Sequence, residues 1–162
     1  MGTGKPKVDD AEETRKMIKM SEDRTLERVV HLRVPNIAES AAMVRAYVQE
    51  LAELNDADDQ FIAEMMLVVG EAFANAVEHG KSTEPIEIKV EIENKTMTVD
   101  IWDHGVGFAV EIHQQKIPDL YSERGRGMIL MATLSDSCTI ASAPGWGTRV
   151  TIIRRLRAIS NV

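Results

Sequence analysis

An acid and an amide lie one helical turn apart in the apolar stretch GEAFANAVEHG, residues 70–80. Glu71 and Asn75 are four positions apart, and Glu78 falls close to the same line. At about 3.6 residues per turn, such positions project from one side of a helix. A carboxylate can take a proton, and an amide oxygen can bind a hard cation such as Mg²⁺. A solvated polar stripe explains the same pattern, so this helix alone does not establish a site.

A carboxylate and two glycines follow a predicted strand in IWDHGVGF, residues 101–108. Asp103, Gly105 and Gly107 occupy alternate positions. A carboxylate fixed at a strand end can accept hydrogen bonds from an exocyclic amine such as that of adenine. The glycines let the backbone approach a flat ring or adopt positive φ. An ordinary Asp–Gly turn is the structural alternative.

A second glycine pair, Gly125 and Gly127, lies in SERGRGMILM immediately before a helix predicted from Met128. Free amide groups and the helix dipole at such a position favour phosphate oxygens. Arg124 and Arg126 add positive charge that suits a phosphate-bearing ligand, although exposed loop arginines are equally compatible with the sequence.

The last motif is GWGT, residues 145–148, at a predicted hairpin. A glycine turn accounts for it in isolation. The hydroxyl of Thr148, at the start of a strand, is also placed to join the hydrogen bonds of a ligand.

Hydrophobic periodicity predicts the elements that position these motifs. Alternation predicts strands over residues 30–34, 86–92, 96–102, 137–142 and 148–154. Helical spacing predicts helices over residues 37–54, 60–79 and 128–134. Asp58 or Asp59 is the expected N-cap of the second helix, and Gly80 its expected stop. Helices on one side and consecutive hairpins on the other imply an α+β, two-layer sandwich.

Composition restricts the possible partners and compartments. The chain has 162 residues, 44% apolar and 28% charged, with a formal net charge of −7. Because no long basic run offsets this charge, direct binding to nucleic acid is not expected. The single cysteine, Cys138, is expected to be a buried, inert thiol. Without a signal-peptide core or an expected membrane-spanning segment, a cytoplasmic protein is the simplest account.

The two ends of the chain are expected to lie outside any site. Residues 1–25 are rich in charge and predict an N-terminal arm, beside a single domain over residues 26–157. The RRLR segment, residues 154–157, is expected to be a solvated end.

Taken in order, the four motifs resemble those of the GHKL ATP-binding family of gyrase, the ninety-kilodalton heat-shock chaperone, histidine kinases and the mismatch-repair protein. The resemblance covers residues 28–154, and within the family the chain resembles the small anti-sigma-factor serine kinases of bacteria. It implies a Bergerat-type fold, with a mixed, mostly antiparallel sheet and helices on one face. The family's N-box matches Glu71 to Gly80, and its third glycine box matches Gly147 and Thr148.

The resemblance also implies a role for each motif. Glu71 would be the general base on a serine hydroxyl, Asn75 would bind Mg²⁺, and Asp103 would recognise the adenine amine. The implied contacts with ATP come from Asn75, Asp103, Gly105, Gly107, Arg124, Gly125, Arg126, Gly127, Met128 and Thr148. For His79, a helix-capping or packing role is favoured over catalysis.

The implied function is an ATP-dependent protein-serine kinase that phosphorylates a STAS-type anti-sigma antagonist and sequesters a sigma factor, as a homodimer. A non-catalytic, nucleotide-dependent binding module is the alternative. The short lid between Phe108 and Gly125 favours it, whereas Glu71 and Asn75 disfavour it. A detached histidine-kinase domain fits less well, because residues 1–25 are too short for a dimerising helical hairpin and His31 lies in a predicted strand.

Overall fold

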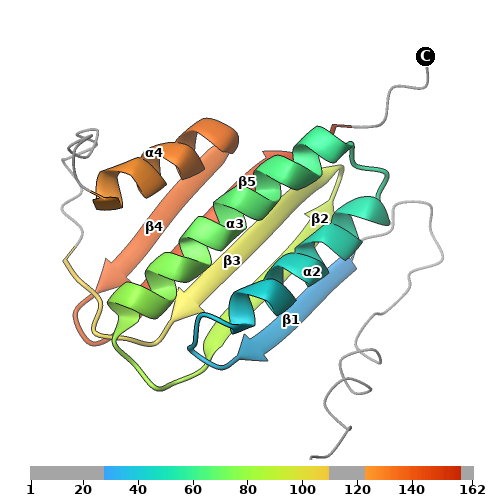
Figure 1. Cartoon of the computed structure of the whole chain (residues 1–162). Coiled ribbons are helices and arrows are strands. Elements are labelled where there is room, and N and C mark those ends of the chain that lie inside the picture. Colours follow the sequence, from blue (N-terminus) through green and yellow to red (C-terminus); the bar gives the residue numbers. More distant parts are fainter. Residues whose placement is uncertain (1–27, 110–122, 158–162) are drawn as a thin grey trace, which may run out of the picture.

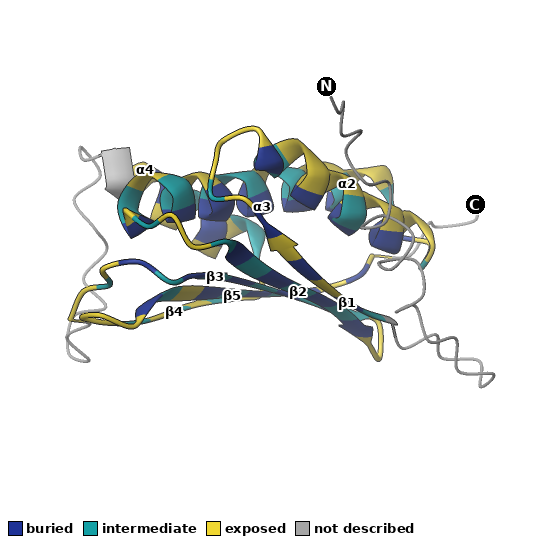
Figure 2. Cartoon of the chain, turned by 90° about the horizontal axis from the view of Figure 1, so that it is seen from below, coloured by how far each residue is buried: buried dark blue, intermediate teal, exposed yellow. Residues whose placement is uncertain are grey.

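The computed structural model describes residues 28–109 and 123–157, which form one sheet covered by helices on a single face (Figures 1 and 2). The sheet has five strands in the order β1-β2-β3-β5-β4. The elements are β1 (Arg28–Val34), α2 (Ser40–Glu53), α3 (Asp59–Gly80), β2 (Ile86–Glu93), β3 (Thr96–Asp103), α4 (Glu123–Leu134), β4 (Ser137–Ala143) and β5 (Gly147–Arg155). The expected arm, residues 1–25, lies outside the described residues.

All four pairings between the described strands are antiparallel. In β2 the isoleucines and the valine at alternate positions are buried, while the charged residues between them lie on the other face. The turn from β2 to β3 has positive φ at Asn94 and Lys95, which matches the right-handed twist of a tight hairpin. The predicted α+β, two-layer sandwich is therefore confirmed.

Helix α3 is the central element of the core. Its N-cap is Asp58, whose side chain accepts a hydrogen bond from the Phe61 backbone N–H at 2.7 Å. Phe61, Met65 and Phe73 of its inner face are at most 1% exposed. The predicted stop is shifted by one position, because Gly80 is the last helical residue and Lys81 adopts the left-handed conformation, with φ 50°. The absence of a side chain at Gly80 instead leaves room for the Asp103 side chain, whose carboxyl atoms would lie 3.1 Å from a Cβ there.

Among the described residues, α3 alone is long and apolar enough to cross a membrane by length and composition, with a mean hydropathy of 1.3. The sequence-based expectation that no segment reaches this length is therefore wrong. The same test is passed by core helices of soluble proteins. In this fold the apolar face of α3 packs against β3 and β5 of the sheet, which accounts for its composition.

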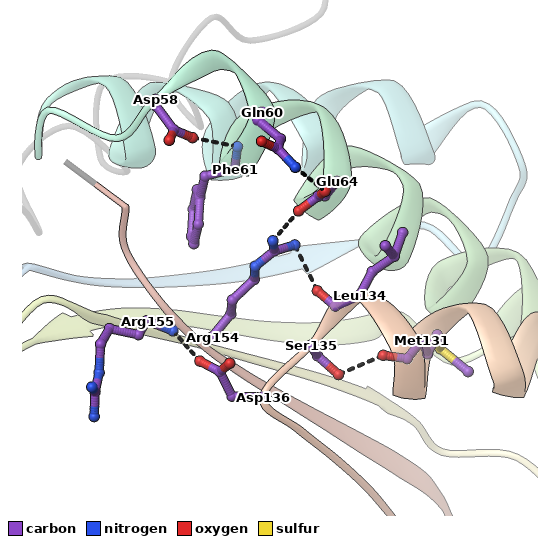
Figure 3. A network of polar contacts seen from close by, with 10 residues as sticks. All are labelled: Asp58, Gln60, Phe61, Glu64, Met131, Leu134, Ser135, Asp136, Arg154 and Arg155. Carbon is purple, nitrogen blue, oxygen red and sulfur yellow. Dashed lines mark hydrogen bonds and ion pairs between the residues drawn. The ribbon is translucent and has the colours of Figure 1, made fainter. Parts of the chain in front are cut away.

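A buried arginine joins α3, α4 and β5 at the end of the sheet opposite Asp103 (Figure 3). Arg154 is 5% exposed and forms an ion pair with Glu64 of α3. It also donates to the Leu134 carbonyl at 2.6 Å and lies over the Phe61 ring at 5.3 Å. The expectation of a solvated RRLR end is therefore wrong for Arg154, because β5 continues to Arg155 and turns this side chain toward the helices.

Candidate functional site

A cavity of about 670 Å³ lies between the C-terminal half of α3, α4 and the ends of β3, β4 and β5. Its walls are largely apolar, from Ile101, Met128, Met131, Ile140 and Val150. Asn75, His79, Lys81, Asp103 and Thr148 supply polar groups. An apolar cavity with a few convergent polar groups is the usual form of a small-molecule site.

Asp103 is the buried acceptor of this cavity. It ends β3 and is 3% exposed. Its Oδ1 accepts a hydrogen bond from the Gly105 N–H at 2.9 Å, and the carboxylate also accepts from the Thr148 N–H. Burial raises the pKa of Asp103 above its ordinary 3.8, although these two hydrogen bonds and His104 oppose the shift. The ring of this residue's neighbour Trp102 lies on the other face of the sheet, against Trp146 and His104.

This raised pKa predicts a pH dependence of stability. Since the folded chain holds the Asp103 proton to higher pH than the unfolded chain, the contribution of Asp103 to the unfolding free energy falls as pH rises above 3.8 through the folded pKa. Comparing urea unfolding of wild type and Asp103→Asn across acid pH measures it. The unfolding free energy of wild type should fall relative to that of Asp103→Asn as the pH rises. A difference between the two free energies that does not change with pH would contradict the prediction.

Three glycines allow backbone segments to touch around Asp103. A Cβ on Gly105 would lie 1.9 Å from the Gly80 carbonyl oxygen, and one on Gly147 would lie 2.0 Å from the Asp103 carbonyl oxygen. Gly107 has φ 61°, and its Cβ would lie 2.0 Å from the Ala143 carbonyl oxygen. No side chain fits these positions, so the glycines tie the segment after β3 to α3 and to the β4–β5 hairpin.

The polar line of α3 divides into three environments. Asn75 lines the cavity. Glu71 is half-buried beside α4, where a Cβ on Gly127 would lie 1.9 Å from its Oε1. Glu78 has a side chain that is 69% exposed, as the sequence predicted. The structure therefore separates an amide in the cavity, an acid at the α3–α4 contact and an acid in solvent.

Helix α4 begins earlier than predicted. It starts at Glu123, so Gly125 and Gly127 lie inside it and not ahead of it. A glycine in a helix costs only about 1 kcal/mol relative to alanine, and Gly127 is the position that lets α4 approach Glu71. Met128 lines the cavity and Arg126 is exposed. The side chain of Arg124, the surroundings of Gly125 and most of the expected lid lie outside the described residues.

Two polar residues of the cavity were missed by the sequence interpretation. His79 lines the cavity, although a capping or packing role was expected for it, and Lys81 lies beside it. The signal was present, because His79 follows Asn75 by one helical turn, as Asn75 follows Glu71. Cys138 is only half-buried, and burial raises the pKa of its thiol, which agrees with an unreactive cysteine.

The sequence profile of the histidine kinase-like ATPase domain matches residues 34–154. The chain belongs to this ATPase family. The match contains α2, α3 and all of the cavity-lining residues described above. The resemblance drawn from the four motifs is therefore confirmed.

Curated relatives lie within the same family. The anti-sigma F factor of Pasteuria penetrans is 33% identical over 135 residues, covering 77% of this chain and 89% of that protein. The anti-sigma F factor of Anoxybacillus flavithermus is 32% identical over 136 residues, covering 78% and 92%. Each match spans most of both proteins.

A solved structure from Mycobacterium tuberculosis that contains RsbU and RsbW domains is also similar, with a TM-score of 0.62 and 23% identity. The match covers 82% of this chain and 34% of that one, so this chain spans about a third of its length. At this level of identity the likeness shows the shared fold.

The family implies a bound nucleotide, and the residues present fit one. The glycine contacts shape a backbone wall, Asp103 supplies a buried acceptor, and the apolar side chains suit a flat ring. Among the described residues no group of three His, Cys, Asp or Glu side chains gathers to hold a metal ion. Asn75, which lines the cavity, has an amide oxygen that would hold a Mg²⁺ ion, because hard oxygen ligands suit this ion.

Proposed function

We propose that this chain is an ATP-dependent protein-serine kinase that phosphorylates a STAS-type anti-sigma antagonist and also holds a sigma factor. The observation that carries the proposal is the placement of Glu71 and Asn75 on adjacent turns of α3, beside a cavity whose buried acceptor is Asp103. The names of the curated relatives, anti-sigma F factors, support the choice of partners.

The division of roles follows from the position of each group. In this proposal Asp103, the buried carboxylate of the cavity, binds the amine edge of a purine, and Asn75, which lines the same cavity, supplies an amide oxygen that would hold Mg²⁺. Bound ATP would supply the phosphoryl group, and Mg²⁺ held by Asn75 would offset its charge. Glu71, one turn before Asn75, takes the proton of the attacking serine hydroxyl without displacing the metal ligand.

Incubating the protein with γ-labelled ATP, Mg²⁺ and purified STAS-type candidates tests the proposal. We expect label on one serine of the cognate antagonist, and loss of affinity between the two proteins after transfer, because the phosphate adds negative charge at their contact. ATP binding without transfer to any antagonist would instead support the non-catalytic binding module. The packing of α4 against Glu71 is the observation that favours that alternative.

The contact between α4 and Glu71 gives a specific mutational prediction. A methyl group in Gly127→Ala would overlap the Glu71 carboxylate, which is the mobile end of a side chain, so the variant should fold and move Glu71. Misplacing a catalytic group by about 1 Å can cost about 10²-fold in rate, so transfer should fall by this order. Single-turnover transfer and thermal unfolding measure the two effects.

A matched glycine substitution controls for the added methyl group. In Gly70→Ala the nearest atom to the new Cβ, on Arg45, is 3.4 Å away, so no carboxylate is displaced. This variant should unfold like wild type. Unchanged transfer by Gly127→Ala would show that Glu71 does not need its present position.

The assembly and location of the protein belong to the same proposal. We expect a cytoplasmic homodimer that binds a sigma factor and does not bind nucleic acid or a membrane. Affinity capture from the native cell with ADP or with ATP, followed by identification of the bound proteins, tests these partners. A sigma factor and an antagonist that exchange according to the nucleotide would support partner switching.

A further inference from the structure

The hydroxyl of Ser142 joins three segments at the edge of the cavity. Ser142 is in β4 and pairs with Thr148 of β5, on the same face of the sheet as the cavity-lining Ile140. Its Oγ accepts a hydrogen bond from the Phe108 N–H at 2.9 Å and donates to the Gly147 carbonyl at 2.8 Å. It also lies 2.9 Å from Thr148 Oγ1.

A count of protons fixes the direction of the bond between the two hydroxyls. The Gly147 carbonyl can only accept, so the single Ser142 proton is used there. In the contact with Thr148, the threonine must therefore be the donor. Ser142 then donates once and accepts twice, from Phe108 and Thr148, which is the full capacity of a hydroxyl group.

This direction determines what Thr148 offers to a ligand. Because its proton points to Ser142, Thr148 Oγ1 presents only lone pairs to the cavity. The Thr148 and Gly105 N–H groups are both directed to the Asp103 carboxylate. Asp103 and Thr148, which line the cavity, therefore present acceptors to it, and neither the Thr148 nor the Gly105 N–H is left as a free donor.

We propose that Ser142 is a positioning residue for base selectivity: by holding the Thr148 hydroxyl as an acceptor, it makes the cavity favour a purine with an amine at position 6 over one with a carbonyl. The inference rests on the proposed binding of ATP and deepens it. The amine at position 6 of adenine can donate hydrogen bonds to the acceptors of Asp103 and Thr148, whereas hypoxanthine places a carbonyl oxygen against these acceptors. A site whose polar groups match one hydrogen-bonding pattern rejects a ligand that leaves them unpaired or opposed.

The test compares ADP with inosine diphosphate, whose bases differ at position 6 and the adjoining ring nitrogen. Calorimetric titration of the full chain should give tighter binding of ADP, by about tenfold or more. In Ser142→Ala the Thr148 hydroxyl can turn and donate a hydrogen bond. The dissociation constant for inosine diphosphate divided by that for ADP should therefore fall about five- to tenfold. Ser142→Thr, which keeps the hydroxyl, should restore the ratio.

A double-mutant cycle shows whether Ser142 acts through Thr148. Thr148→Val should also lower the ratio of the inosine diphosphate dissociation constant to that of ADP. The double variant Ser142→Ala/Thr148→Val should have the same ratio as Thr148→Val alone. An equal loss of affinity for both nucleotides in Ser142→Ala would show a merely structural role and overturn the proposal. If Ser142→Ala does not fold, Thr148→Val is sufficient as a test: a ratio equal to that of wild type would overturn the proposal.

These titrations are independent of phosphoryl transfer. If the wild-type chain prefers ADP but phosphorylates no antagonist, the proposed kinase activity is refuted and the proposed role of Ser142 is not. A chain that binds both nucleotides equally would refute the role of Ser142 while leaving transfer open to its own assay.

Discussion

Glu71→Ala is expected to abolish phosphoryl transfer while leaving the dissociation constant for ATP largely unchanged. General-base catalysis contributes about 10²–10⁴-fold, so the rate should fall by at least the lower value. Binding should survive because the acceptor wall at Asp103 and the apolar lining of the cavity do not include Glu71. Single-turnover transfer to the antagonist and calorimetric titration with ATP measure the two quantities.

The chain offers a matched control on the same helix. Glu78→Ala removes an equal charge from α3, at an exposed position outside the cavity lining. It should transfer phosphate at the wild-type rate. Glu71→Gln keeps the size and the polarity of the side chain but not its basicity, so it should fail like Glu71→Ala. Normal transfer by either Glu71 variant would exclude this residue as the base.

The sheet and the central helix could be predicted because local patterns decide them. The alternation in residues 86–92 fixes which face of β2 is buried, whatever packs against it. Asp58 caps α3 by accepting a hydrogen bond from the N–H of Phe61, three positions later, so the start of the helix is encoded within four residues. Asp103 could also be predicted, since a carboxylate at a strand end followed by alternate glycines limits the possible backbone.

The features that were not predicted depend on contacts between distant segments. Two glycines suggested that α4 starts after Gly127, but packing against Glu71 outweighs their weak helix propensity. The arginine-rich end looked solvated because its partner Glu64 is ninety positions away. The role of Ser142 depends on three segments that meet only in the folded sheet.

Breaking the Glu64–Arg154 ion pair is expected to cause the largest loss of stability. In Glu64→Ala the guanidinium of Arg154, 5% exposed, loses its counter-charge and remains buried. Burial already lowers the pKa of Arg154, which shows that the site disfavours an uncompensated charge. Removing one partner of a buried pair costs about 3–5 kcal/mol, to be measured by urea unfolding.

The matched substitutions separate charge from packing. Glu64→Gln keeps an acceptor for Arg154 and should cost less than Glu64→Ala. Glu64→Leu combined with Arg154→Met replaces the pair by shorter apolar side chains. It should recover most of the lost stability, because neither charge is then left without a partner. A double variant as unstable as Glu64→Ala would show that the bond to the Leu134 carbonyl, and not the ion pair, holds this end of α4. Since Met128 and Met131 of α4 line the cavity, that result would also predict weaker ATP binding in the double variant.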